Sequence, residues 1–223
     1  MSGQQRALPI EAALSRVRRL GTAGAIMIFP LLFVLIYAVH PNLLGLRPML
    51  TLEDWTGRFH GRPLLHAAHA LMTLAVPLLV VAAFHFAAIV RGRGAWFGFV
   101  GGAMAVLGCV ILAADKGALC LTASAFDTLT VGDYAKIRPA LIVMHERAGW
   151  LSLLWLLPLL PVGFAIQGIG VVRERLMPTW RGTALVTGAL LLANPDIELI
   201  SLLASVLIGV ALVPYGWALL RSR

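Results

Sequence analysis

The feature that most constrains this chain is a series of long apolar runs that are almost free of charge. A helix needs about 20 apolar residues to cross the hydrocarbon core of a bilayer. The runs therefore predict an all-α, polytopic membrane protein, a bundle of about six transmembrane helices that forms a single domain over residues 1–223. The expected spans cover about 21–39, 64–90, 94–115, 148–172, 180–195 and 199–220.

The composition agrees with a lipid environment. Only 13% of the residues are charged and 60% are hydrophobic, whereas a soluble domain carries roughly 25% charged residues. The mean hydropathy is +0.89. A chain of 223 residues with six spans leaves no room for a separate soluble domain.

The positions of the charges predict the orientation. The N-terminus, the 91–93 turn, the 173–181 segment and the C-terminus together hold eleven arginines and two glutamates. The connections on the other face hold seven basic and eight acidic residues. Because basic residues collect on the cytoplasmic side, both termini are expected in the cytoplasm, and the Ala-, Leu-, Gly- and Arg-rich composition is compatible with a bacterial inner membrane.

The arginines flank apolar segments, a pattern typical of topology signals. It does not indicate a surface for binding nucleic acid, which requires a clustered basic face. The expected partners are the lipid bilayer and either other membrane subunits or a second copy of the chain.

Two outer loops are expected, at 41–63 and 116–147. The first contains Thr51-Leu-Glu-Asp54, a capping pattern, followed by Trp55. It predicts a short interfacial helix with Trp55 at the depth of the headgroups. The second loop is largely apolar and predicts either helices that extend beyond the bilayer or segments that fold back onto the protein.

Polar side chains gather at the outer ends of the predicted spans. The run at 182–194 is too short to cross the core. Either Thr179–Arg181 are drawn in from the cytoplasmic side, or the turn after the run lies below the outer surface, where it would help to form an outward-facing polar cavity. Charged groups at membrane depth are costly and therefore informative. The cluster comprises His66, His69, Asp115, His145, Glu146 and Asp196.

Three interpretations of this cluster stay open. In the first, the charges meet headgroups, water and one another, and the protein is a small inner-membrane protein of undetermined activity, such as an accessory subunit of a membrane complex. In the second, His69 and His145 come from different helices at one depth and clamp a b-type haem, with His66 as the alternative to His69.

The third interpretation is a metal-dependent membrane hydrolase. Zinc or copper would be held by His66, His69 and His145. A carboxylate would serve as a further ligand or as the general base. The candidates for this catalytic role are Asp115, Glu146 and Asp196.

The segment Leu176–Gly182 contains Pro178-Thr-Trp180-Arg-Gly182 directly before the short fifth run. It resembles the Pro-x-Trp-x-Gly step of small, uncharacterised six-helix integral membrane proteins of bacteria. The resemblance implies the six-helix topology and carries no chemistry, so no site residue depends on it.

Overall fold

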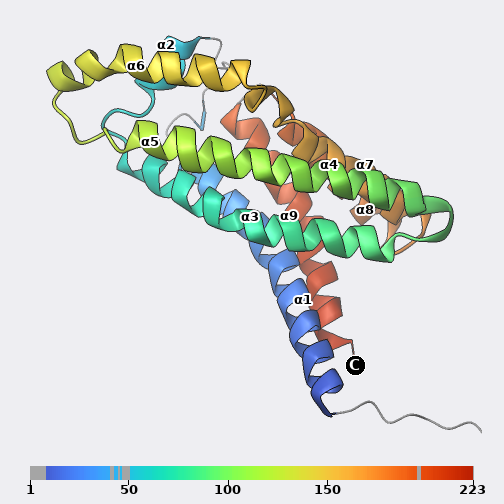
Figure 1. Cartoon of the computed structure of the whole chain (residues 1–223). Coiled ribbons are helices and arrows are strands. Elements are labelled where there is room, and N and C mark those ends of the chain that lie inside the picture. Colours follow the sequence, from blue (N-terminus) through green and yellow to red (C-terminus); the bar gives the residue numbers. More distant parts are fainter. Residues whose placement is uncertain (1–8, 41–42, 45, 47–50, 195–196, 223) are drawn as a thin grey trace, which may run out of the picture.

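The computed structural model describes residues 9–40, 43–44, 46, 51–194 and 197–222, and over these residues the chain forms helices and turns without a strand. This confirms the all-α class (Figure 1). The longer helices are α1 (Pro9–Ala38), α3 (Pro63–Ile89), α4 (Ala95–Ala114), α6 (Val131–Trp150), α7 (Leu159–Arg173), α8 (Thr179–Leu192) and α9 (Glu198–Arg221). The short ones are α2 (Leu52–Gly57) and α5 (Leu121–Ser124).

Five helical segments in the described part of the chain are long and apolar enough to cross a membrane. The remaining predicted span, the fifth at 180–195, corresponds to α8, which has 14 residues and rises only about 21 Å at about 1.5 Å per residue. The five segments are Ile10–Ala38, Pro63–Ile89, Gly92–Ser124, Leu154–Arg173 and Glu198–Arg221.

The third apolar segment extends further than its predicted end near residue 115. After α4 the helix continues through a π-helical turn, Asp115–Cys120, and then through α5. The predicted outer loop 116–147 is therefore largely helical, since α6 fills most of its remainder.

The fourth apolar segment starts later than the predicted 148–172. The chain leaves helical geometry at Ser152, whose φ is 60°, and resumes a helix only at Leu154. The preceding helix, α6, carries charges such as Asp133 and Lys136, so it is unsuited to the bilayer core. Hydropathy alone does not mark this break, because the residues around it are apolar.

The main hydrophobic core lies among six helices: α1, α3, α4, α7, α8 and α9. The helices α1 and α9 lie side by side (Figure 1). Near the C-terminus of α9, Arg19 of α1 donates a hydrogen bond to the carbonyl of Ser222. The helix α4 packs between α3 and α7, and α8 contacts both α7 and α9. Large buried side chains of this core include Phe29, Leu79 and Phe86.

Close approach of α4 and α7 depends on glycine. A Cβ atom at Gly108 would overlap the backbone of Leu160, and one at Gly163 would overlap the backbone of Ala105. Small residues at such contacts let helix backbones approach in a membrane, where packing drives association.

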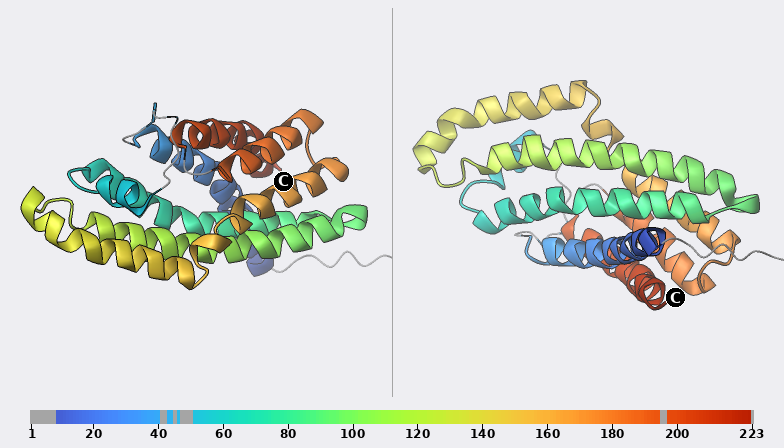
Figure 2. Two further views of the ribbon diagram at one scale, coloured as in Figure 1. Left: turned by 90° about the horizontal axis from the view of Figure 1, so that it is seen from above. Right: turned by 60° about the horizontal axis from the view of Figure 1, so that its bottom comes forward.

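The helices α2 and α6 form a cap at the end of the molecule where α5 ends (Figure 2). The Thr51 hydroxyl accepts a hydrogen bond from the Asp54 amide at 3.1 Å, which confirms the predicted capping of the N-terminus of α2. Tyr134 of α6 donates to the carbonyl of Thr56 at 2.7 Å. Trp55, expected at headgroup depth, is only 8% exposed because it packs inside this cap.

Candidate functional site

A cavity of about 560 Å³ runs from the middle of the bundle to the cap. Its inner walls are apolar and come from all five spanning segments and from α8. Its outer end is polar. The apolar lining includes Phe29, Phe33, Met72, Leu79, Leu112, Leu160, Phe164, Leu185, Ala189 and Ile208, and the polar end includes Tyr37, Thr51, Asp115, Lys116, His145, Asn194 and Ser201.

Asp115 and Lys116 lie at this polar end, on the π-helical turn. Asp115 is buried, and its carboxylate lies 2.9 Å from the Lys116 ammonium. A buried charge at membrane depth is tolerated when it is paired. The sequence-predicted residue Asp115 therefore lines the cavity as one half of an ion pair.

His145, another predicted residue, reaches the cavity from α6. Its ring stacks on Trp55 with the centroids 4.0 Å apart, and its Nδ1 is buried without a hydrogen-bond partner. Burial lowers the pKa of His145 from the ordinary 6.5, and the positive charge of Lys116 lowers it further, whereas Asp115 opposes the shift. The imidazole is therefore neutral at pH 7.

The other predicted residues lie elsewhere. His66 Nδ1 is 2.6 Å from the Ser124 hydroxyl, and the His69 ring packs against Phe59. Neither histidine is among the residues that line the cavity. Glu146 is exposed on α6. Asp196 lies outside the described residues.

The metal site at His66, His69 and His145 stays a prediction. Within the described ranges, no group of three or more His, Cys, Asp or Glu side chains is placed to hold a metal ion. The three histidines of the zinc or copper hypothesis each have different neighbours: Ser124 for His66, Phe59 for His69 and Trp55 for His145.

Two aromatic rings connect the histidines of the haem hypothesis. A series of ring contacts leads from His69 to Phe59 (5.6 Å between centroids), then to Trp55 (4.8 Å) and to His145 (4.0 Å). His69 and His145 are thus linked through two aromatic rings and make no direct ring contact in this series. The haem site stays a prediction.

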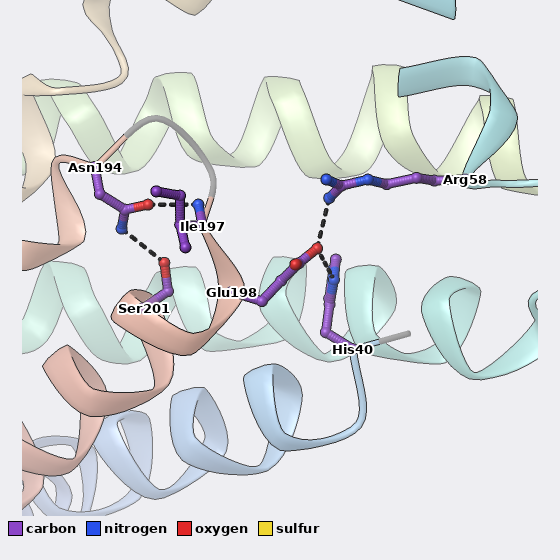
Figure 3. A network of polar contacts seen from close by, with 6 residues as sticks. All are labelled: His40, Arg58, Asn194, Ile197, Glu198 and Ser201. Carbon is purple, nitrogen blue, oxygen red and sulfur yellow. Dashed lines mark hydrogen bonds and ion pairs between the residues drawn. The ribbon is translucent and has the colours of Figure 1, made fainter. Parts of the chain in front are cut away.

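The structure adds a buried network that was not predicted (Figure 3). Glu198, at the first position of α9, is 1% exposed. Its Oε1 accepts hydrogen bonds from Arg58 Nη1 at 2.5 Å and from His40 Nδ1 at 2.8 Å, while its Oε2 is buried without a partner. The network joins the segment just after α1, the start of α9 and the residue that follows α2.

A second set of contacts links Asn194, which follows α8, to the start of α9 (Figure 3). Asn194 Oδ1 accepts from the Ile197 amide at 2.5 Å, and its Nδ2 donates to the Ser201 hydroxyl at 2.9 Å. Both Asn194 and Ser201 line the cavity. The sequence places the residues of both networks at a similar predicted depth, near the outer ends of the helices. Depth alone does not reveal which of these side chains are in contact.

In the part of the chain that the structure describes, these features define an all-helical protein with five helices able to span a membrane and an amphipathic cavity between them. No protein-family model matches the chain, and comparison with curated proteins and with solved structures finds no similar one.

Proposed function

We propose that this protein binds one lipid-like amphiphile within the membrane. The apolar part of the ligand would lie among the spanning helices, and its polar head would lie beside Asp115, Lys116 and His145. The observation that carries this proposal is the change of the cavity lining from apolar to polar along the direction of the helices. The volume of about 560 Å³ falls in the range of small-molecule pockets, about 300–1,000 Å³.

A binding or accessory role is favoured over hydrolysis by the state of the polar groups. Asp115 is paired with Lys116, and Asn194 is bonded to Ser201. A general base needs an accessible group whose pKa suits proton transfer, whereas mutually paired groups are suited to position a head group. The protein could perform this role alone or as an accessory subunit of a membrane complex.

We also propose six crossings, with α8 as a short crossing, both termini in the cytoplasm and a location in a bacterial inner membrane. The arginine distribution supports this orientation. Contacts between helix ends that are both assigned to the cytoplasmic side support it as well. The Glu174 carboxylate accepts a hydrogen bond from the Gly94 amide at 2.5 Å, and Arg19 donates to the carbonyl of Ser222. At the other side, Glu198 meets His40.

Exposed tryptophans support the same boundaries. Trp96, Trp180 and Trp217 lie at helix ends assigned to the cytoplasmic side, and Trp150 and Trp155 lie at the break before α7 on the other side. Tryptophan is enriched at both membrane–water interfaces because its ring is amphipathic.

The test of the binding function is native mass spectrometry of the full-length protein released from its membrane. We expect one amphiphile to stay bound to the wild type and to be lost from Ala189→Phe, because the added ring occupies the cavity that Ala189 lines. The matched control is Ala88→Phe, at an exposed position of α3. Equal retention of the amphiphile by the wild type and Ala189→Phe would contradict the proposal, as would a wild type without bound amphiphile.

A further inference from the structure

We infer that the amphiphile has an uncharged head bearing a hydroxyl group, as in a monoacylglycerol. This inference rests on the proposed binding function and specifies the chemical class of the ligand. It is carried by two observations at the polar end of the cavity: the cancelled charges of Asp115 and Lys116, and the unused hydrogen-bonding capacity of His145.

The charges disfavour an ionic head. The Asp115 carboxylate and the Lys116 ammonium are 2.9 Å apart, so their formal charges cancel. An anionic head would bring a second negative charge beside Asp115, and a cationic head would bring a second positive charge beside Lys116. An ion taken from water into such a site needs a partner of its own to offset its lost hydration.

A second buried carboxylate nearby is also accounted for. Glu198 is held on Oε1 by Arg58 and His40, which offset its charge, and its Oε2 is buried away from water. It is not among the residues that line the cavity.

His145 favours a hydroxyl. Its ring lines the cavity and its Nδ1 has no partner. A neutral imidazole has one donor and one acceptor nitrogen. Because Nδ1 is buried, the ring would offer Nε2 to a ligand in the cavity, and a hydroxyl group suits this nitrogen in either tautomer because it both donates and accepts. Burial lowers the pKa of His145, so the ring supplies no positive charge for an anionic head at pH 7.

The experiment compares three radiolabelled probes that share one oleyl-type chain: monooleoylglycerol, oleyl sulfate and oleyl trimethylammonium. The full-length protein is reconstituted into phosphatidylcholine nanodiscs, and saturable binding is measured for each probe. We expect monooleoylglycerol to bind at least about tenfold more tightly than either charged probe, since a buried unpaired polar or charged group costs that much or more.

The variant His145→Phe keeps a ring against Trp55 but removes the nitrogens, and we expect it to bind monooleoylglycerol about tenfold more weakly. His145→Gln, which can hydrogen-bond, should recover part of the affinity. The matched control is His85→Phe, because His85 bonds to Tyr215 and is not a lining residue. Gel filtration of each variant confirms that it folds.

The outcomes separate the inference from the function it rests on. If a charged probe binds as tightly as monooleoylglycerol, the inference on the head is wrong and the cavity still binds amphiphiles. Unchanged binding of monooleoylglycerol to His145→Phe overturns the role of the imidazole. If none of the probes binds to the wild type, while Ala189→Phe also fails to alter the amphiphile bound in the native membrane, both proposals are wrong.

Discussion

Glu198 has its carboxylate at the first turn of α9, removed from water and held on one oxygen by Arg58 and His40. Such a group contributes to a stable fold only while its partners are present. Removing one partner of a buried ion pair leaves a charge without compensation, which is more damaging than replacing the whole pair.

Arg58→Met should therefore lower the free energy of unfolding by about 3–5 kcal/mol. The measurement is thermal or denaturant unfolding in detergent. Lys136→Met is the control, because Lys136 pairs with Asp133 at 2.8 Å on the exposed side of α6, and exposed pairs contribute only about 0–1 kcal/mol. Equal effects of the two substitutions would show that the Glu198 network does not stabilise the fold.

His145 gives the stability a dependence on pH. Burial holds its folded-state pKa below the 6.5 of the unfolded chain, so below pH 6.5 the unfolded state binds more protons than the folded state. The contribution of His145 is present in full above pH 6.5 and is lost as the pH falls from there towards the folded-state pKa.

We expect the unfolding temperature of the wild type to fall between pH 7.5 and pH 5, and to fall less for His145→Phe. Differential scanning fluorimetry at closely spaced pH values provides the comparison. Parallel curves for the two proteins would mean that this histidine titrates alike in both states.

At the scale of elements, the contact between α4 and α7 is set by backbones in direct contact. Because a Cβ at Gly163 would overlap the backbone of Ala105, a rigid neighbour would have to shift. Gly163→Ala should therefore destabilise the protein by about 1–3 kcal/mol, the usual effect of overpacking.

Gly24→Ala is the matched control for this substitution. Gly24 lies in α1, and nothing lies within 4 Å of the position its Cβ would take. Alanine favours helix over glycine by about 1 kcal/mol, so this variant should be at least as stable as the wild type. Unfolding in detergent again gives the comparison, and a stable Gly163→Ala protein would contradict the packing argument.

The elements were predictable where their signal is local. Spanning segments depend on the composition of about 20 successive residues, so the sequence predicted all five and also the short α8. The break at Ser152 and the extension to Ser124 depend on a single backbone angle and on packing against neighbours. Hydropathy contains neither kind of information.

The site was predictable at the level of depth only. The common depth of polar residues placed Asp115 and His145 near one another, and both line the cavity. The contact of Glu198 with His40 and Arg58 depends on which helices are neighbours in the bundle, which hydropathy does not encode. The metal and haem hypotheses assumed a convergence of His69 and His145, but Phe59 and Trp55 stand between them in the ring series.

At the scale of the whole molecule, the direction of each helix and the number of crossings are linked. If α8 crosses the membrane, the chain crosses six times and both termini lie on one side. If α8 does not cross, five crossings leave the termini on opposite sides.

Single cysteines decide between these topologies in a background where the buried Cys109 and Cys120 are replaced by alanine. We expect a membrane-impermeant maleimide to label Gly132→Cys in α6 on intact cells, and to label Ser2→Cys and Ser222→Cys only after permeabilisation. Labelling of just one of the two terminal variants on intact cells would rule out six crossings.

The π-helical turn at Asp115–Cys120 has a consequence for how such a protein can change over generations. A π-helical turn accommodates one residue more than an α-helical turn, so the gene could lose a single codon there and the helix would rewind without shifting the faces of α4 or α5. The wide turn that brings both Asp115 and Lys116 to the cavity would be lost. One small deletion or insertion could therefore remove or create the polar end of the cavity while the surrounding bundle is inherited unchanged.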